Sequence, residues 1–150
     1  MTNKDLTIII TTFKSEDKIE NCLNSINTSI NVIIVENSNN EKFKHYIEKK
    51  YPNVNCMLTN QNLGYGKANN VGLRKATSKY SLILNPDTVL DTEAINNFFI
   101  FSKKNINFAM AGPAQSKKEF ALVSSLENKN LNFLETDKIE GFAMFLNMEK

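Results

Sequence analysis

A carboxylate stands directly after a short apolar run in the second half of the sequence. Residues 81–84 (SLIL) have the composition of a buried strand, and Asn85, Pro86 and Asp87 follow them at once. Proline fixes φ and offers no N–H, so it ends strand pairing and holds Asp87 at the tip of the strand. A carboxylate at such a tip can bind a divalent cation that neutralises a diphosphate, although a polar turn explains the same residues.

Polar residues follow three other apolar runs in the same way. These segments are Thr11-Thr12-Phe13, Glu36-Asn37-Ser38 and the loop Asn62-Leu63-Gly64-Tyr65-Gly66. Glycines allow backbone N–H groups to approach a phosphate, and the start of a following helix favours negative charge. The G-x-G element does not complete the dinucleotide fingerprint, because Asn69 stands where that motif has glycine or alanine. Taken singly, a tight turn or a solvated acid also explains each segment, so their importance depends on whether the fold brings them together.

The hydrophobic pattern predicts an α/β fold that does so. Buried strands are expected at Leu6–Phe13, Asn31–Glu36, Val54–Thr59, Tyr80–Leu84, Asn107–Gly112 and Gly141–Leu146, and an edge strand at Phe120–Leu126. Alternation of strands with helices of about ten residues indicates a mostly parallel sheet with right-handed crossovers. Ligands bind at the carboxyl ends of such strands, so the four polar segments are expected to share one rim.

Helical periodicity occupies the intervals between these strands. Ser15 is expected to cap a first helix, whose inward face is Ile19, Cys22, Leu23 and Ile26. A second, short helix is expected around Phe43, Tyr46 and Ile47, a third over 67–75 with Ala68, Val71 and Ala76 inward, and a fourth with Ile95, Phe98, Phe99 and Ser102 on one face.

The composition describes one globular domain. The 150 residues carry a net charge of +2, which is too small to favour nucleic acid or an anionic membrane surface as partner. Cys22 and Cys56 form no metal or disulfide motif, which favours a reducing compartment, and His45 is expected at the surface. The apolar run near the N-terminus is too short for a signal peptide or a membrane span. These features predict a cytoplasmic protein with no nucleic-acid partner and no integral membrane segment.

Four segments together resemble a known family. LTIIITTF, VIIVENSN, NLGYGKANNVGL and LILNPDTVL occur in the order and spacing of the nucleotide-sugar half of family 2 glycosyltransferases with the GT-A fold, and are particularly similar to rhamnosyltransferase-like bacterial members. The resemblance covers residues 5–115 well and IEGFAMFLNMEK weakly. It implies a nucleotide-sugar-binding half at 1–112 and a partial acceptor-side segment at 113–150. Since the last strand stands four residues before Lys150, we expect the GT-A domain to be truncated here.

The resemblance also implies roles for individual residues. It places Thr11, Thr12 and Phe13 at the base and ribose, and Glu36 at the base, where the family usually has aspartate. Asn62, Gly64, Gly66, Lys67 and Asn69 would border the nucleotide. The D-x-D element of the family reads Asn85-Pro86-Asp87 here, so Asp87 alone would supply a carboxylate to Mg²⁺ or Mn²⁺, and the metal site is one charge short.

The activity implied is inverting transfer of a sugar from a UDP or dTDP donor to a glycan or lipid-linked acceptor, in assembly of bacterial surface polysaccharide. The resemblance implies an enzyme that works in the cytoplasm, where it can also bind peripherally to the inner face of the membrane. The family's general base lies beyond the strand at 141–146, and Glu140 does not match it, so the base is expected beyond Lys150 and residues 1–150 alone are expected to transfer little or no sugar.

Two other functions remain open at this stage. A degenerate glycosyltransferase-like module would bind a nucleotide, or nothing, and act through partners. A sugar nucleotidyltransferase would share the sugar-nucleotide chemistry but usually carries a glycine- and arginine-rich loop after its first strand, where this chain has Lys14-Ser15-Glu16.

Overall fold

The computed structural model describes residues 2–114, 136 and 138–150, and it confirms the α/β fold class. A six-stranded sheet has the strand order β3-β2-β1-β4-β6-β5. The strands are β1 (Leu6–Thr12), β2 (Asn31–Glu36), β3 (Val54–Leu58), β4 (Tyr80–Leu84), β5 (Met110–Ala111) and β6 (Ala143–Asn147). The helices are a 3-10 turn, η1 (Asn3–Asp5), and α1 (Ile19–Asn24), α2 (Glu41–Lys50), α3 (Tyr65–Lys75) and α4 (Ala94–Lys104).

Strand β1 lies in the middle of the parallel part of the sheet. All seven of its residues are buried, as expected for a β-branched run covered on both faces. It pairs in parallel with β2 on one side and β4 on the other, so that Thr12 lies opposite Glu36 and Ile9 opposite Ile83. The three strands therefore run in one direction and deliver their carboxyl ends to the same rim.

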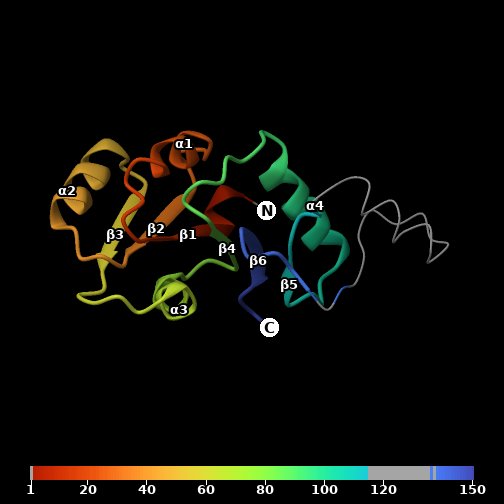
Figure 1. The fold of residues 1–150 in the computed structure, drawn as a ribbon. Helices are drawn as coiled ribbons and strands as arrows, with labels where there is room; N and C mark the ends of the chain where they lie inside the picture. The colour runs from red at the N-terminus through yellow and green to blue at the C-terminus, as the bar shows by residue number, and fades with distance from the viewer. Residues whose placement is uncertain (1, 115–135, 137) are drawn as a thin grey trace.

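Helices cover the two faces of the sheet unequally. Figure 1 shows α1, α2 and α4 on one face and α3 on the other. The larger layer holds the main hydrophobic core, in which Ile8 and Ile10 of β1 pack with Ile19 of α1, Ile47 of α2 and Phe99 of α4. Among the described residues, no helix is long and apolar enough to cross a membrane.

Strand β6 joins the end of the chain to the same sheet. It lies between β4 and β5 and is antiparallel to both. Its Phe145 stacks on Tyr80 with ring centroids 5.2 Å apart, and on Phe108 at 5.4 Å. Aromatic packing of this kind contributes beyond the area it buries, so the last described strand is firmly attached to the core built on the parallel strands.

Several elements differ from the sequence prediction. Helix α1 begins only at Ile19, because the Ser15 hydroxyl donates to the Phe13 carbonyl (3.0 Å) instead of capping a helix. The strand expected at 107–112 shrinks to Met110–Ala111, and the expected Phe120–Leu126 strand lies outside the described residues.

The inward face of α3 also differs from the one expected. Asn69 and Gly72 are buried beside Ala68, whereas Val71 and Ala76 are only half-buried. Other sequence predictions are confirmed: His45 is exposed, and both cysteines are free and buried.

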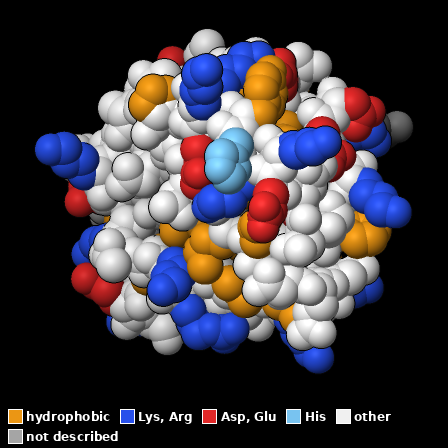
Figure 2. All heavy atoms as spheres, turned by 90° about the vertical axis from the view of Figure 1, so that its left-hand side faces the viewer, with side chains coloured by type: hydrophobic (Ala, Val, Ile, Leu, Met, Phe, Trp, Pro, Cys, Tyr) orange, Lys and Arg blue, Asp and Glu red, His pale blue; other side chains and the backbone are white. Residues whose placement is uncertain are grey.

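An ion pair on α2 covers the outer edge of β3. Lys44 and Glu48 are 3.1 Å apart; Glu48 accepts a hydrogen bond from the Cys56 N–H (2.8 Å), and Lys44 donates to the Cys56 carbonyl. Burial raises the pKa of the Glu48 carboxyl, but the Cys56 N–H and the Lys44 ammonium outweigh it, and the pKa is lowered overall. Figure 2 shows basic and acidic side chains mixed over this side of the molecule, rather than gathered by sign.

Gly72 allows α3 to pack closely on the sheet. A Cβ at this position would lie 2.5 Å from Cγ2 of Ile9 and 3.2 Å from Cγ2 of Val35, whereas a Cβ at Gly66 would meet nothing within 4 Å. Gly72→Ala is therefore expected to lower the free energy of unfolding by about 1–3 kcal/mol, as overpacking does. Gly66→Ala in the same helix should be neutral or stabilising by up to about 1 kcal/mol. Urea unfolding measures both, and equal effects would contradict the close packing.

Candidate functional site

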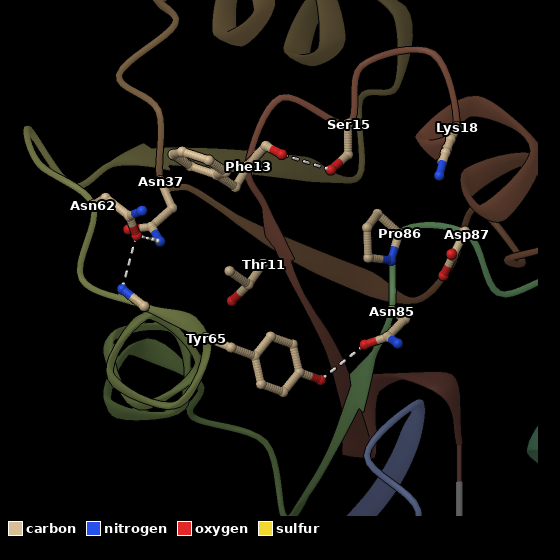
Figure 3. Close-up of a pocket in the computed structure, with 11 residues that line it drawn as sticks. Thr11, Phe13, Ser15, Lys18, Asn37, Asn62, Tyr65, Asn85, Pro86 and Asp87 are labelled. Carbon is tan, nitrogen blue, oxygen red and sulfur yellow. Dashed lines mark hydrogen bonds between the residues drawn. The ribbon is translucent and has the colours of Figure 1, made fainter.

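A pocket of about 390 Å³ lies at the carboxyl ends of β1, β2 and β4. Figure 3 shows its side chains converging from these strands, from the loop before α3 and from the turn before α1. Its lining residues are Thr11, Phe13, Ser15, Lys18, Asn37, Asn62, Gly64, Tyr65, Asn85, Pro86 and Asp87. The predicted shared rim thus exists as a cavity of ligand size.

Side-chain alternation decides which strand ends reach this pocket. Successive side chains of a strand point to opposite faces. Thr11, Asn37 and Asn85 point to the face that α3 covers, and all three line the pocket. Thr12 and Glu36, one position away from Thr11 and Asn37, are 1% exposed and do not line it.

Side-chain amides form one end of the pocket. The Asn37 amide nitrogen donates to the Asn62 side-chain oxygen (2.9 Å), and the Asn37 oxygen accepts from the backbone N–H of Leu63 (2.9 Å). The Asn62 oxygen also accepts from the N–H of Gly64 (2.9 Å), which has φ +74°. These bonds hold the loop before α3 in one shape, and Gly64 adopts its φ of +74° and ψ of 164° without the strain that a side chain would cause.

The floor of the pocket is a buried hydrogen bond. The Thr11 hydroxyl donates to the Asn69 side-chain oxygen at 2.6 Å, and both residues are buried. Asn69, which the resemblance places beside the nucleotide, anchors α3 to β1 beneath the cavity, and it is not among the residues that line the pocket.

Tyr65 crosses the pocket from the first turn of α3. Its hydroxyl lies 2.9 Å from the Asn85 side-chain oxygen and 2.8 Å from the Gly141 carbonyl, and it donates toward these two acceptors. Burial raises the pKa of this hydroxyl, so it stays protonated and remains a donor at neutral pH. One tyrosine therefore connects α3, the tip of β4 and the residues leading into β6.

The Glu36 carboxylate is engaged by its own loop. One oxygen accepts from the Ser38 N–H (3.0 Å) and from the Ser38 hydroxyl, and the other accepts from the Asn40 N–H (2.6 Å). Asn40 in turn caps α2 by accepting from the Phe43 N–H (3.0 Å). In this arrangement Glu36 holds the connection from β2 to α2, and Asn37 is the residue that faces the pocket.

Asp87 is the only acidic residue among those that line the pocket. It is exposed and follows Pro86 in a turn closed by the bond from the Thr88 N–H to the Asn85 carbonyl (3.1 Å). The same carbonyl lies 3.7 Å from the Cys22 sulfur, which acts as a weak donor from α1. Burial, with a smaller contribution from Asp87, raises the pKa of the Cys22 thiol to about 12, so this cysteine is a packing residue rather than a nucleophile.

The structure thus brings together part of the predicted set. Of the predicted site residues, those lining the pocket are Thr11, Phe13, Asn62, Gly64, Asn85 and Asp87. Those that do not line it are Thr12, Glu36, Gly66, Lys67 and Asn69. Five lining residues had no ligand role assigned from the sequence: Ser15, Lys18, Asn37, Tyr65 and Pro86. Of these, Asn37, Tyr65 and Pro86 belong to segments that were predicted to share the rim. Strand alternation alone would have identified Asn37, whereas no sequence signal marks Lys18.

A mostly parallel sheet with a polar pocket at its carboxyl rim is the arrangement in which α/β proteins hold their ligands. The sequence matches the family model "Glycosyl transferase family 2" over residues 7–146. The chain therefore belongs to glycosyltransferase family 2, as its motifs predicted.

Two curated relatives match about three quarters of this chain. The chain is 26% identical over 119 residues to the low-salt glycan biosynthesis hexosyltransferase of Haloferax volcanii, covering 77% of this chain and 38% of that protein. It is 29% identical over 119 residues to the teichoic acid poly(glycerol phosphate) polymerase of Staphylococcus epidermidis, covering 74% of this chain and 16% of that protein.

Solved structures share the GT-A fold. The mannosyltransferase PcManGT of Pyrobaculum calidifontis, in complex with GDP-Man and Mn²⁺, superposes with a TM-score of 0.79 at 17% identity, over 97% of this chain and 45% of that one. S. aureus TarS in complex with UDP-GlcNAc gives a TM-score of 0.58 at 23% identity, over 74% of this chain and 36% of that one. This chain thus spans less than half the length of each of these relatives.

The position of Glu36 leads to a stability prediction. Glu36→Gln replaces one acceptor oxygen by an NH₂ group that faces a backbone N–H, so a partly buried donor is left without a partner. We expect a loss of about 1–3 kcal/mol in the free energy of unfolding without any nucleotide present. Glu41→Gln, at an exposed carboxylate in the first turn of α2, should change it by less. An unchanged stability for Glu36→Gln would contradict a structural role for this carboxylate.

Proposed function

We propose that this chain forms the donor-binding part of a glycosyltransferase that takes its sugar from a nucleoside-diphosphate sugar. The observation that carries the proposal is that Thr11, Asn37, Asn62 and Asp87, from the four motifs that resemble the family, line one pocket. Support comes from family membership and from the nucleotide sugars named with the solved neighbours, GDP-Man and UDP-GlcNAc.

The two ends of the pocket suit different parts of such a donor. The side-chain NH₂ groups of Asn37 and Asn62 retain N–H donors for a nucleobase, because their oxygens already accept bonds within the loop, and the half-exposed ring of Phe13 offers a stacking surface. Figure 3 places Asp87 at the end away from these amides. We assign the base to the amide end and the diphosphate to the Asp87 end.

A divalent metal fits this site as a partner of the nucleotide. No group of three or more potential ligand side chains occurs among residues 2–114, 136 and 138–150, and the side-chain oxygen of Asn85 is already engaged by Tyr65. Mg²⁺ in nucleotide sites is commonly held by one or two carboxylates together with substrate phosphates, and Mn²⁺ has similar ligand preferences. Asp87 would hold the metal, which would stabilise charge on the leaving diphosphate.

The finer reaction is part of the same proposal. We infer transfer with inversion to a glycan or lipid-linked acceptor, by an enzyme acting in the cytoplasm or at the inner face of the membrane. Inversion needs a base to deprotonate the acceptor hydroxyl. Asp87 is the only acid that lines the described pocket, and it is assigned to the metal, so we place the base in a part of the full protein outside these residues.

Thermal unfolding with UDP, dTDP and GDP, each with and without Mn²⁺, tests the proposal. A ligand at 100 times its Kd stabilises a protein by about 2.7 kcal/mol, which for a domain of this size raises Tm by about 5–10 °C. We expect at least one nucleotide to give such a rise with Mn²⁺, and Asp87→Ala to remove most of it. Asp91→Ala, an acid outside the pocket, is the matched control.

The same experiment separates the alternatives. No rise with any nucleotide, from a well-folded protein, would overturn the donor-site proposal and favour a degenerate module that acts through partners. A rise that is independent of both Mn²⁺ and Asp87 would retain nucleotide binding but overturn the metal assignment.

A further inference from the structure

Lys18 brings a positive charge to the same end of the pocket as Asp87. It lies in the turn before α1, where its backbone N–H donates to the Ser15 carbonyl (3.1 Å) and ends the loop that follows β1. Its exposed side chain lines the pocket together with Asp87 and Pro86. Figure 3 shows its ammonium directed toward that end of the pocket, away from Asn37 and Asn62.

No carboxylate neutralises this ammonium within the described part of the chain. The ion pairs found there engage Lys44, Lys50 and Lys79, and none includes Lys18. A cation that lines a pocket without a protein partner is available to an anionic ligand, because it does not have to give up an existing ion pair.

Two nearby lysines are placed differently. The Lys14 ammonium lies 5.7 Å from the centroid of the Phe13 ring, and Lys14 does not line the pocket. Lys67 belongs to α3 and does not line it either. Lys18 is thus the only basic side chain that lines the cavity among the described residues.

Asn85 is a neutral amide, so Asp87 is the one carboxylate that lines the pocket among the described residues. The Asn85 side-chain oxygen accepts a bond from Tyr65 and adds no charge to the site. A diphosphate entering here meets one protein carboxylate, which repels it without metal, and one protein ammonium, which attracts it whether or not metal is present.

We propose that Lys18 binds the diphosphate of the donor directly, and that part of the nucleotide affinity of this chain is therefore independent of metal. The inference rests on the proposed function, because it assigns a ligand group to the same pocket. It adds a residue that no motif indicated. It also means that the diphosphate meets two cations, the metal held by Asp87 and the ammonium of Lys18.

The test compares Lys18→Met, Lys18→Arg and Lys49→Met with the unchanged chain by isothermal titration calorimetry. Lys49 is an exposed lysine on α2, outside the pocket, and serves as the control. The probes are UDP, GDP, uridine and guanosine, in EDTA and in Mn²⁺. For whichever diphosphate binds, Lys18→Met should weaken affinity about tenfold in EDTA, which corresponds to about 1.4 kcal/mol. Lys18→Arg should retain most of the affinity, and Lys49→Met should equal the unchanged chain.

The nucleosides identify the part of the ligand that Lys18 contacts. Uridine or guanosine should bind Lys18→Met and the unchanged chain equally, because neither carries phosphate. Equal diphosphate affinity in Lys18→Met would overturn the Lys18 assignment while leaving the donor site in place. An equal loss for nucleoside and diphosphate would also overturn it, since it would indicate a disturbed pocket. Failure of the unchanged chain to bind any probe, with or without Mn²⁺, would overturn the donor site itself.

Discussion

Parallel pairing of β1 with both β2 and β4 is the constraint on which the rest of the structure depends. It fixes three strand ends at one rim, and the alternation of side chains then divides the rim residues between two faces. Thr11 and Asn37 face the pocket, while Thr12 and Glu36 point into the layer of α1 and α2. A slip of one residue in either pairing would exchange these sets, so the hydrophobic register of the core also determines which polar groups meet a ligand.

Most of the fold follows from the sequence because the strands are continuous apolar runs bounded by polar residues. The bounds of β2 and β4 match the prediction, since each run stops where an acid or an amide begins. The failures occur where a local bond or a distant partner decides. Serine is a common N-cap residue, but the Ser15 hydroxyl donates to the Phe13 carbonyl and α1 begins only at Ile19. Strand β5 is limited to the two residues that pair with β6, which lies far along the chain.

The sequence can predict those pocket residues that are marked by motifs or by side-chain alternation among neighbouring residues. Motifs that end strands indicated Thr11, Asn62 and Asp87, and alternation along β2 explains why Asn37 lines the pocket and Glu36 does not. Tyr65 depends on acceptors 20 and 76 residues later, which no local pattern reveals. The result is a pocket in which neutral amides fix the shape of one end, and the Asp87 carboxylate and the Lys18 ammonium are the charged groups that the described residues place at the other.

The ion pair that covers β3 has a consequence for how this sheet can grow. An added strand needs free N–H and C=O groups on an outer edge, and at Cys56 both are already bonded to α2. Hydrogen bonds to side chains occupy the backbone groups of Cys56 on this edge. A strand from another molecule would have to displace the charged side chains of Lys44 and Glu48 to pair at Cys56. The opposite edge, β5, offers only two residues. At Cys56, the middle residue of β3, the sheet is thus protected against pairing with a strand of another molecule.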